Sequence, residues 1–448
     1  MSKTTKRIST LSLAIAGLAC SLASASHAQS LVELYESARA HDASYLSARL
    51  QFEASQARAE QARANVLPTV GLSAGANVTT LDLPDNPRSL LNRSFPTQSA
   101  TLSASQPLYR PANFALNEQG RKQLELAQAQ LESAEQELIV RTSQAYFDVL
   151  ASQDSLTFVR AQKAAVAEQL ASARRNFEVG TATITDTREA QARFDLVLAQ
   201  EIAAENDLRV KKLALDQLVG KTDAQPRALV LPLALPAVQP PDVNAWVQQA
   251  QSAHPSIRQA KSNVEIAQLE VTRAEAGHKP TLDLTASIAA ANSPKGNASN
   301  VAASKSNTAA VGLSFNLPLF AGFATQNRIR EALALSDKAR SDLEGAQRTI
   351  AQSTRTAYFG VVSGQGQVKA LEAAELSSQS ALDANRLGYQ VGVRINIDVL
   401  NSQSQLFQTK RDLARARYDV LVGGLRLRQA SGTLGAQDLQ AINMLLVR

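Results

Sequence analysis

The stretch Tyr389–Asp398, YQVGVRINID, decides the fold, because the chain contains it in two related copies. The earlier copy is Phe177–Asp186, FEVGTATITD, and the separation of 212 residues (389 − 177) holds at both ends. Other pairs have the same separation of 212 residues: Pro-Thr at 68 and 280 (280 − 68), and Ala-Tyr-Phe at 145 and 357 (357 − 145). The Pro-Leu-aromatic pair at 107 and 318 is separated by 211 residues (318 − 107). So regular a separation over so long a span indicates that a whole structural unit was duplicated.

Long proline-free stretches on either side of these copies predict helical rods. No proline falls in 112–225 or 319–448, and proline costs about 3 kcal/mol in a helix interior. A seven-residue repeat of apolar or small positions, broken by one serine, runs along the first stretch: Leu124, Leu131, Leu138, Ala145, Ser152, Val159, Val166 and Ala173. This is coiled-coil spacing, and a helix over 112–178 would be roughly 100 Å long. Its counterpart is expected over 324–390.

Each rod is expected to end in a chain reversal. Gly180 and Gly392 follow the rods directly, and glycine readily adopts the left-handed conformation that ends a helix. We therefore predict return helices at 184–219 and 397–430. Shorter helices are expected at about 43–66 and 256–278.

A β-hairpin is predicted in each half, over 69–107 and 281–318. Apolar residues alternate there with small or polar ones for about ten residues per strand, a length that suits a membrane-spanning strand. Polar loops, 82–97 and 292–308, would cap the hairpins. The alternative is a soluble hairpin packed against the helices.

If these strands lie in lipid, the chain must oligomerise. Four strands cannot close a barrel, and an open sheet edge is not tolerated in lipid. Closed membrane barrels begin at about eight strands. Two chains would supply about eight strands, three about twelve and four about sixteen.

The N-terminus is typical of a secretory signal peptide over 1–28. Basic residues precede an apolar run, Leu11–Ala19, and small residues lead to Ala28. The run is too short for an anchor helix. Cys20, the only cysteine, could be lipidated, but the residues before it stand in the reverse of the lipoprotein order, which favours ordinary cleavage. The mature chain would then hold no disulfide.

Composition excludes several classes of function. Hydrophobic residues make up 44% with aromatics at 4%, which suits close helix packing better than one large core. The net charge of +6 is spread over 448 residues, so a nucleic-acid partner is not predicted. His41, His254 and His278 are widely spaced, and no metal cluster, phosphate-binding loop or nucleophile elbow appears. We expect no enzyme activity, no metal and no cofactor.

The copy beginning at Tyr389 and continuing to Leu400 resembles the periplasmic-tip motif of the TolC outer-membrane efflux family. The first copy, with Asn176 before it and Asp186 at its end, resembles the matching tip motif. The similarity of layout covers essentially the whole mature chain, including both hairpins.

The resemblance implies a mainly α fold with a β-barrel: long coiled-coil rods and two hairpins per chain, internally duplicated. It implies a homotrimer with a 12-stranded barrel in outer-membrane lipid and a periplasmic α-helical tunnel. A periplasmic adaptor protein and an inner-membrane transporter would dock at its tip. The structural repeats would be 29–220 and 243–432. A proline-rich linker at 221–242 and a C-terminal segment at 433–448 would contribute to a belt around the tunnel.

The resemblance also assigns roles to residues of the tip. Asp398 would project into a pore constriction, and Asn401 stands where the family commonly has a second acid. An acid in the first turn of a helix can equally be a cap or a dipole partner. Asp186, Tyr389 and Arg394 match positions of a network that keeps the tip closed.

The sequence thus predicts an outer-membrane exit duct of a tripartite efflux pump or a type I secretion system, passive and opened at its tip by its partners. The alternative is a secreted coiled-coil structural or adhesin-like protein, whose parallel stalk would lack hairpins and would not fold its rods back.

Overall fold

The computed structural model describes residues 28–81, 93–233, 235–296 and 302–447. The signal peptide predicted over 1–28, with Cys20, lies outside the described residues except for Ala28. Residues 82–92 and 297–301, within the two predicted hairpin loops, also lie outside them.

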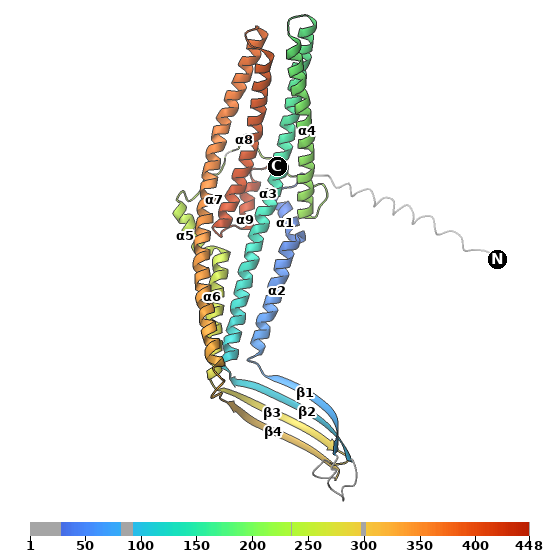
Figure 1. Cartoon of the computed structure of the whole chain (residues 1–448), viewed down its shortest axis with the longest axis vertical. Coiled ribbons are helices and arrows are strands. Elements are labelled where there is room, and N and C mark those ends of the chain that lie inside the picture. The colour runs from blue at the N-terminus through green and yellow to red at the C-terminus, as the bar shows by residue number, and fades with distance from the viewer. Residues whose placement is uncertain (1–27, 82–92, 234, 297–301, 448) are drawn as a thin grey trace, which may run out of the picture.

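The molecule is elongated, with a curved sheet at one end and two helical hairpins at the other (Figure 1). Helices α3 (Pro111–Glu178) and α7 (Ala324–Gln390) run from the sheet to the far end, which we call the tip. There the chain reverses, and α4 (Ile184–Val219) and α8 (Asn396–Ala430) return along them. Each rod with its return helix forms an antiparallel pair.

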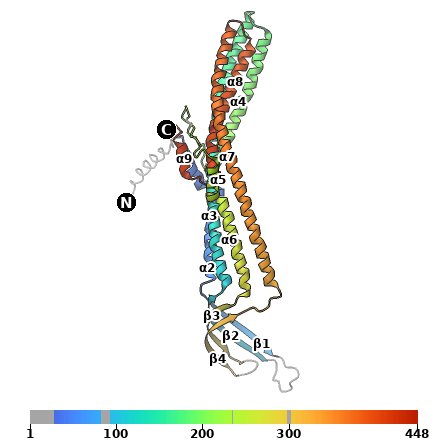
Figure 2. The same ribbon diagram turned by 90° about the vertical axis from the view of Figure 1, so that its left-hand side faces the viewer.

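Shorter helices pack on the half of each rod nearer the sheet. In the first half these are α1 (Leu31–His41) and α2 (Ala43–Ala64), which pack on α3. In the second half, α5 (Val243–Ala253) packs on α7, while α6 (Pro255–Glu275) contacts both rods and leads into the short 3₁₀ turn η1, Ala276–His278. Figure 2 shows α6 beside α3. The helix α9 (Ala436–Asn443) follows α8.

The seven-residue repeat faces the interior of the helical assembly, and from Ser152 onward all of its members are buried. Leu138, Val159, Val166 and Ala173 are at most 4% exposed. Ser152, the polar member, is also buried and donates its hydroxyl proton to Asp207 Oδ2 on α4 at 2.7 Å. A hydrogen-bonded serine is therefore accommodated in an otherwise apolar or small-residue seam.

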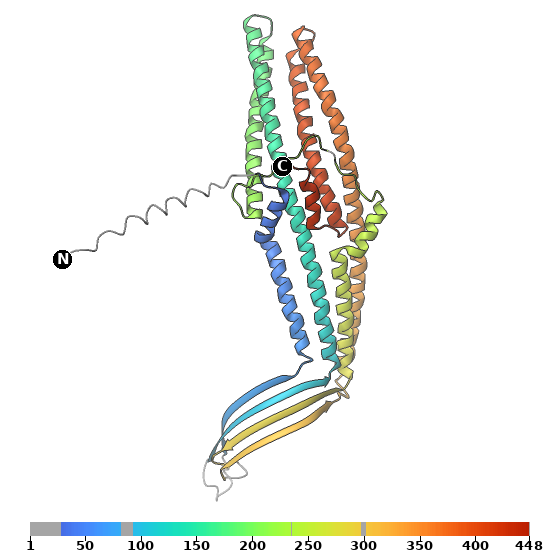
Figure 3. The same cartoon turned by 180° about the vertical axis from the view of Figure 1, so that it is seen from behind.

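The four strands form one antiparallel sheet in the order β1-β2-β3-β4. Their bounds are Thr69–Leu81, Arg93–Tyr109, Thr281–Ser293 and Ser304–Asn316. The two hairpins lie side by side through β2 and β3, so the duplicated halves meet in the middle of the sheet (Figure 3). The edges of the sheet within one chain are β1 and β4.

The two faces of the sheet differ in chemistry. A cross-strand row on one face is Leu72, Leu102, Ile288 and Ala309, while the adjacent row on the other face is Gly71, Ser103, Ser287 and Ala310. Apolar side chains of the first face are strongly exposed, with Leu72 at 76% and Val311 at 79%. An extended apolar surface of this kind indicates contact with lipid or with another chain.

An ion pair joins the two halves where the sheet meets the rods. Arg110, directly before α3, donates from Nε and Nη2 to both carboxylate oxygens of Asp283 on β3, at 2.7 and 2.6 Å. Asp283 is only 6% exposed. This two-bonded geometry is the strong form of an arginine–carboxylate contact.

The middle of the molecule, which we call the waist, contains the largest apolar core. Tyr35, Tyr146 and Phe147 are almost fully buried there, together with side chains of α4, α8 and α9. The linker after α4 and the C-terminal segment pair with each other, with Val230 N donating to Leu445 O at 2.9 Å. The two segments that the resemblance assigns to a belt are thus paired within one chain.

Two expectations about element limits were wrong. The predicted polar loops 82–97 and 292–308 were too wide, because 93–97 belong to β2, 292–293 to β3 and 304–308 to β4. Pro96 lies within β2 although proline has no backbone N–H to donate to a neighbouring strand. It is tolerated because β3 pairs with β2 only as far as Gln98, so that Pro96 has a strand neighbour, β1, on one side only, as on an edge strand. The short helices α1, α5 and α9 were not predicted.

Candidate functional site at the tip

The two tip turns have the same geometry. Gly180 and Gly392 have φ of +78° and +79°, in the left-handed region. After each rod a backbone N–H returns to the last helical turn, with Thr181 N donating to Asn176 O and Val393 N donating to Gly388 O, both at 2.8 Å. A Cβ atom at either glycine would have open space around it, so glycine is favoured here by the backbone conformation.

Asp186 caps its own helix. Its Oδ2 accepts from Thr183 N at 2.9 Å and from the Thr183 hydroxyl at 2.7 Å, and Thr183 Oγ1 accepts from Asp186 N at 3.2 Å. This is a capping box at the start of α4. In the described part of the chain, no hydrogen bond or ion pair joins this carboxylate to Tyr389 or Arg394.

Asp398 lies in the first turn of α8, where its charge is favoured by the helix dipole. Within the described residues, no capping box links its carboxylate to the backbone of the cap residue Ile395. Its carboxylate is about one-third exposed and pairs with Arg394 Nη1 at 3.7 Å. The structure therefore brings two of the predicted tip residues together within one chain, as an exposed pair worth little alone.

Tyr389 connects the two rods. Its hydroxyl accepts a hydrogen bond from Asn176 Nδ2 at 3.2 Å, at the end of α3. The ring packs against the apolar cluster of Leu382, Val399 and Leu406. Within one chain, the hydrogen-bond partner of the Tyr389 hydroxyl is therefore Asn176.

Asn396 is a second connection that the sequence analysis missed. It is 1% exposed, donates from Nδ2 to the backbone oxygen of Asp186 at 3.2 Å and accepts from Gln169 Nε2 through Oδ1. Asp186 therefore takes part in a link between the halves through its carbonyl group. Both asparagines stand inside or beside the duplicated motif, which is the signal that could have pointed to them.

Asn401 lies one turn after Asp398 and faces α4. Its Oδ1 accepts from Arg193 Nη2 at 2.9 Å. This contact connects α4 and α8 about one helical turn further from the tip turn. Asn401 is thus a polar bridge between the two helical pairs within the chain.

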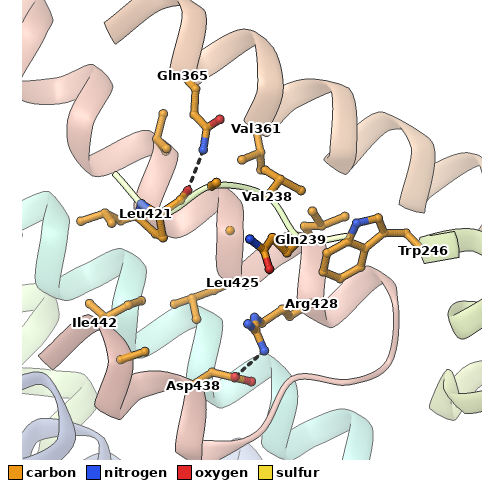
Figure 4. Close-up of a pocket in the computed structure, with 16 residues that line it drawn as sticks. Val238, Gln239, Trp246, Val361, Gln365, Leu421, Leu425, Arg428, Asp438 and Ile442 are labelled. Atoms are coloured by element: carbon orange, nitrogen blue, oxygen red, sulfur yellow. Dashed lines mark hydrogen bonds and ion pairs between the residues drawn. The ribbon is translucent and has the colours of Figure 1, made fainter. Parts of the chain in front are cut away.

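The waist holds a small cavity of about 160 Å³ beneath the linker (Figure 4). Trp246, Val361 and Leu425 give it apolar walls. Its lining includes one carboxylate and one guanidinium, and these pair, with Arg428 Nη1 donating to Asp438 Oδ1 at 2.6 Å. A paired charge in an apolar wall offers neither a nucleophile nor a free base, so catalysis is not indicated here.

Across the described residues, no group of three or more His, Cys, Asp or Glu side chains is placed to hold a metal ion. No described helix is both long enough and apolar enough to cross a bilayer.

Two helical hairpins above a sheet with an exposed apolar face define a duplicated, duct-forming class of protein. The sequence matches the family model described as "Outer membrane efflux protein" twice, at 34–221 and 246–433. Both limits differ by 212 residues (246 − 34 and 433 − 221), the separation of the duplicated motifs. The chain belongs to this outer membrane efflux protein family, which includes TolC, and the resemblance found in the sequence is confirmed.

Relatives at the level of sequence support the same family. The chain is 33% identical over 422 residues to the outer membrane protein TolC of Vibrio cholerae, covering 94% of this chain and 95% of that protein. It is 33% identical over 358 residues to the alkaline protease secretion protein AprF of Pseudomonas aeruginosa, covering 78% and 73%. The solved outer membrane protein VceC of Vibrio cholerae has the same fold, with a TM-score of 0.76, 21% identity and coverage of 90% and 96%.

The protein is therefore an outer-membrane exit duct for efflux or type I secretion that extends into the periplasm. The predicted location is confirmed. The family is one of outer-membrane channels and not of enzymes.

Proposed function

We propose that three copies of the chain form one duct, with a 12-stranded barrel in outer-membrane lipid and a helical tunnel in the periplasm. The duct is a passive conduit without catalytic activity of its own. A periplasmic adaptor and an inner-membrane transporter dock at the tip and open it, and the transporter supplies the energy.

The observation that carries this proposal is the unfinished sheet. Strands β1 and β4 are edges within the chain, and the face that includes Leu72 and Val311 is apolar and exposed. Unpaired edges cannot stand in lipid. Pairing β4 of one copy with β1 of the next removes every edge, and three copies give the twelve strands that family resemblance implies.

Mass measurement tests the assembly. Protein purified in detergent should elute as a single species of three chains by light scattering with detergent correction, and native mass spectrometry should give the same stoichiometry. A monodisperse monomer with full β content by circular dichroism would refute the proposal. Cell fractionation tests the adhesin-like alternative, which requires the protein to be found in the medium. The rods fold back at Gly180 and Gly392, and this chain reversal already disfavours a parallel stalk.

A further inference from the structure

A cleft between three helices gathers positive charge without acidic residues. Side chains of α3, α4 and α8 line a space of about 390 Å³, which we call the arginine cleft. Arg193 of α4 and Arg411 of α8 are its charged residues, and the rest of its lining is amide, hydroxyl or aliphatic, with no Asp or Glu. Arg193 of α4 contacts Asn401 of α8 at this cleft, in the part of both helices nearer the tip.

Both guanidinium groups are positioned by neutral amide oxygens. Arg411 donates from Nη1 to Gln162 Oε1 at 3.0 Å and from Nη2 to Gln408 Oε1 at 2.7 Å. Arg193 donates from Nη2 to Asn401 Oδ1 at 2.9 Å. Amide oxygens orient a guanidinium group without neutralising it, so each arginine keeps its full charge beside the cleft.

Neighbouring arginines of α8 do not share this situation. Arg417 pairs with Glu372 at 2.9 Å, and Arg415 pairs with Asp419 at 3.8 Å. Within the described residues, neither Arg193 nor Arg411 has a carboxylate oxygen within 4.0 Å. Burial lowers the pKa of Arg411, although the charge of Asp412 acts against this. The cation of Arg411 is thus partly removed from water without a carboxylate in direct contact, although Asp207 and Asp412 line a neighbouring space that Arg411 also borders.

The floor of the cleft is buried and its rim is exposed. Gln162 is 3% exposed and Val197 is fully buried, whereas Leu196 on the rim is 49% exposed. A ligand can therefore reach the two arginines from solvent and lose part of its own hydration there. Charge–charge contacts strengthen as water is excluded.

We propose that the arginine cleft is a carboxylate-binding site, in which Arg193 and Arg411 share one ligand that carries carboxylate groups. The planar guanidinium group matches the two oxygens of a carboxylate. The space is much larger than one water-sized ion of about 30 Å³, so it suits a carboxylate attached to a larger body. That body is either a free polycarboxylate or an acidic side chain of a docked protein.

Calorimetry on the purified full chain tests this inference at low ionic strength, since salt screens exposed charges. Citrate is the free probe, and a helical peptide with glutamates four residues apart is the protein-like probe. At least one should bind saturably. Arg411→Gln and Arg193→Gln should each weaken that binding about tenfold or more, the usual effect of losing a charge-assisted hydrogen bond.

Two further variants sharpen the test. Arg340→Gln removes the same charge from a pair with Asp337 near the sheet end of α7, and it should leave binding unchanged. Asn401→Asp places a carboxylate beside Arg193 and should weaken binding by competing for that arginine. Circular dichroism establishes that each variant is folded.

The outcomes decide both the site and the source of the carboxylate. Tighter binding of citrate indicates a free ligand, and tighter binding of the peptide indicates a protein side chain. The proposal is overturned if neither probe binds, if the two cleft variants bind like the wild type, or if inorganic phosphate binds as tightly as both carboxylate probes. None of these measurements uses conduction or the oligomeric state, so the inference can fail while the proposed function stands.

Discussion

Replacing the Tyr389 hydroxyl should open the tip. In the structure this hydroxyl accepts from Asn176 Nδ2 at 3.2 Å and so joins the end of α7 to the end of α3. Tyr389→Phe removes the hydrogen bond and keeps the ring, which packs on Leu382 and Leu406. The change therefore acts on the link between the rods and leaves the packing within the α7/α8 pair.

The magnitude follows from the geometry and the proposed trimer. A partly buried neutral hydrogen bond contributes about 0.5–1 kcal/mol. If three equivalent links must break together, their sum is about 1.5–3 kcal/mol, and the ratio of open to closed tip should rise about 10- to 150-fold. Single-channel recording in planar bilayers measures this as open probability.

The donor provides the sharper test. Asn176→Ala should raise open probability by a similar factor, and the double variant with Tyr389→Phe should add little, because both changes remove one bond. The matched control is Tyr358→Phe on the same helix, whose hydroxyl donates to Pro241 O at the waist. It should leave gating unchanged. Fully additive effects of the two tip variants, or equal gating of all variants and wild type, would refute this account of the gate.

Three other perturbations have defined outcomes. Asp398→Ala should reduce cation selectivity and block by trivalent cations, whereas Arg394→Ser should increase both by releasing the carboxylate from its 3.7 Å pair; equal selectivity of all three proteins would assign Asp398 to helix stabilisation alone. Arg110→Ala should lower the free energy of unfolding by about 2–3 kcal/mol, because the buried carboxylate of Asp283 loses its partner. This is less than for a fully buried pair because Arg110 is 43% exposed, and denaturant unfolding measures it. Burial lowers the pKa of His254 in the folded protein, so as the pH falls the unfolded chain takes up a proton at this residue before the folded protein does. Thermal stability should therefore fall as the pH drops below about 6.5, and His254→Asn should reduce this pH dependence.

The rods and strands were predictable because their signals are periodic and long. The seven-residue repeat through Leu138 and Val166 identified α3, and alternation through Leu72 identified β1. Short helices such as α5, Val243–Ala253, give too few turns for a period to stand out. Sequence periodicity therefore predicts long elements and misses the short helices around the waist.

The contact partners of individual side chains were harder to predict from the sequence. The spacing of Thr183 and Asp186 is a capping signal in the sequence itself, and the structure uses this carboxylate in that cap. Arg110 and Asp283 are 173 positions apart, and only the assembled sheet brings them together. Local spacing can identify a cap, whereas a contact between the halves requires the fold.

The arrangement of contacts between the halves suits a duct that opens at one end. At the waist the halves share an apolar core in which Phe147 of α3 stacks on Tyr418 of α8, with ring centroids 5.6 Å apart. At the tip the apolar contact is smaller, with Leu400 and Ile397 of α8 packing on the α3/α4 cluster, and the hydrogen bonds of Tyr389 and Asn396 add to it. The larger apolar surface buried at the waist contributes more than the smaller apolar contact and the few hydrogen bonds at the tip. Displacing α7 and α8 at the tip therefore costs less than displacing them at the waist, which localises opening to the end where Tyr389 and Asn396 form their links.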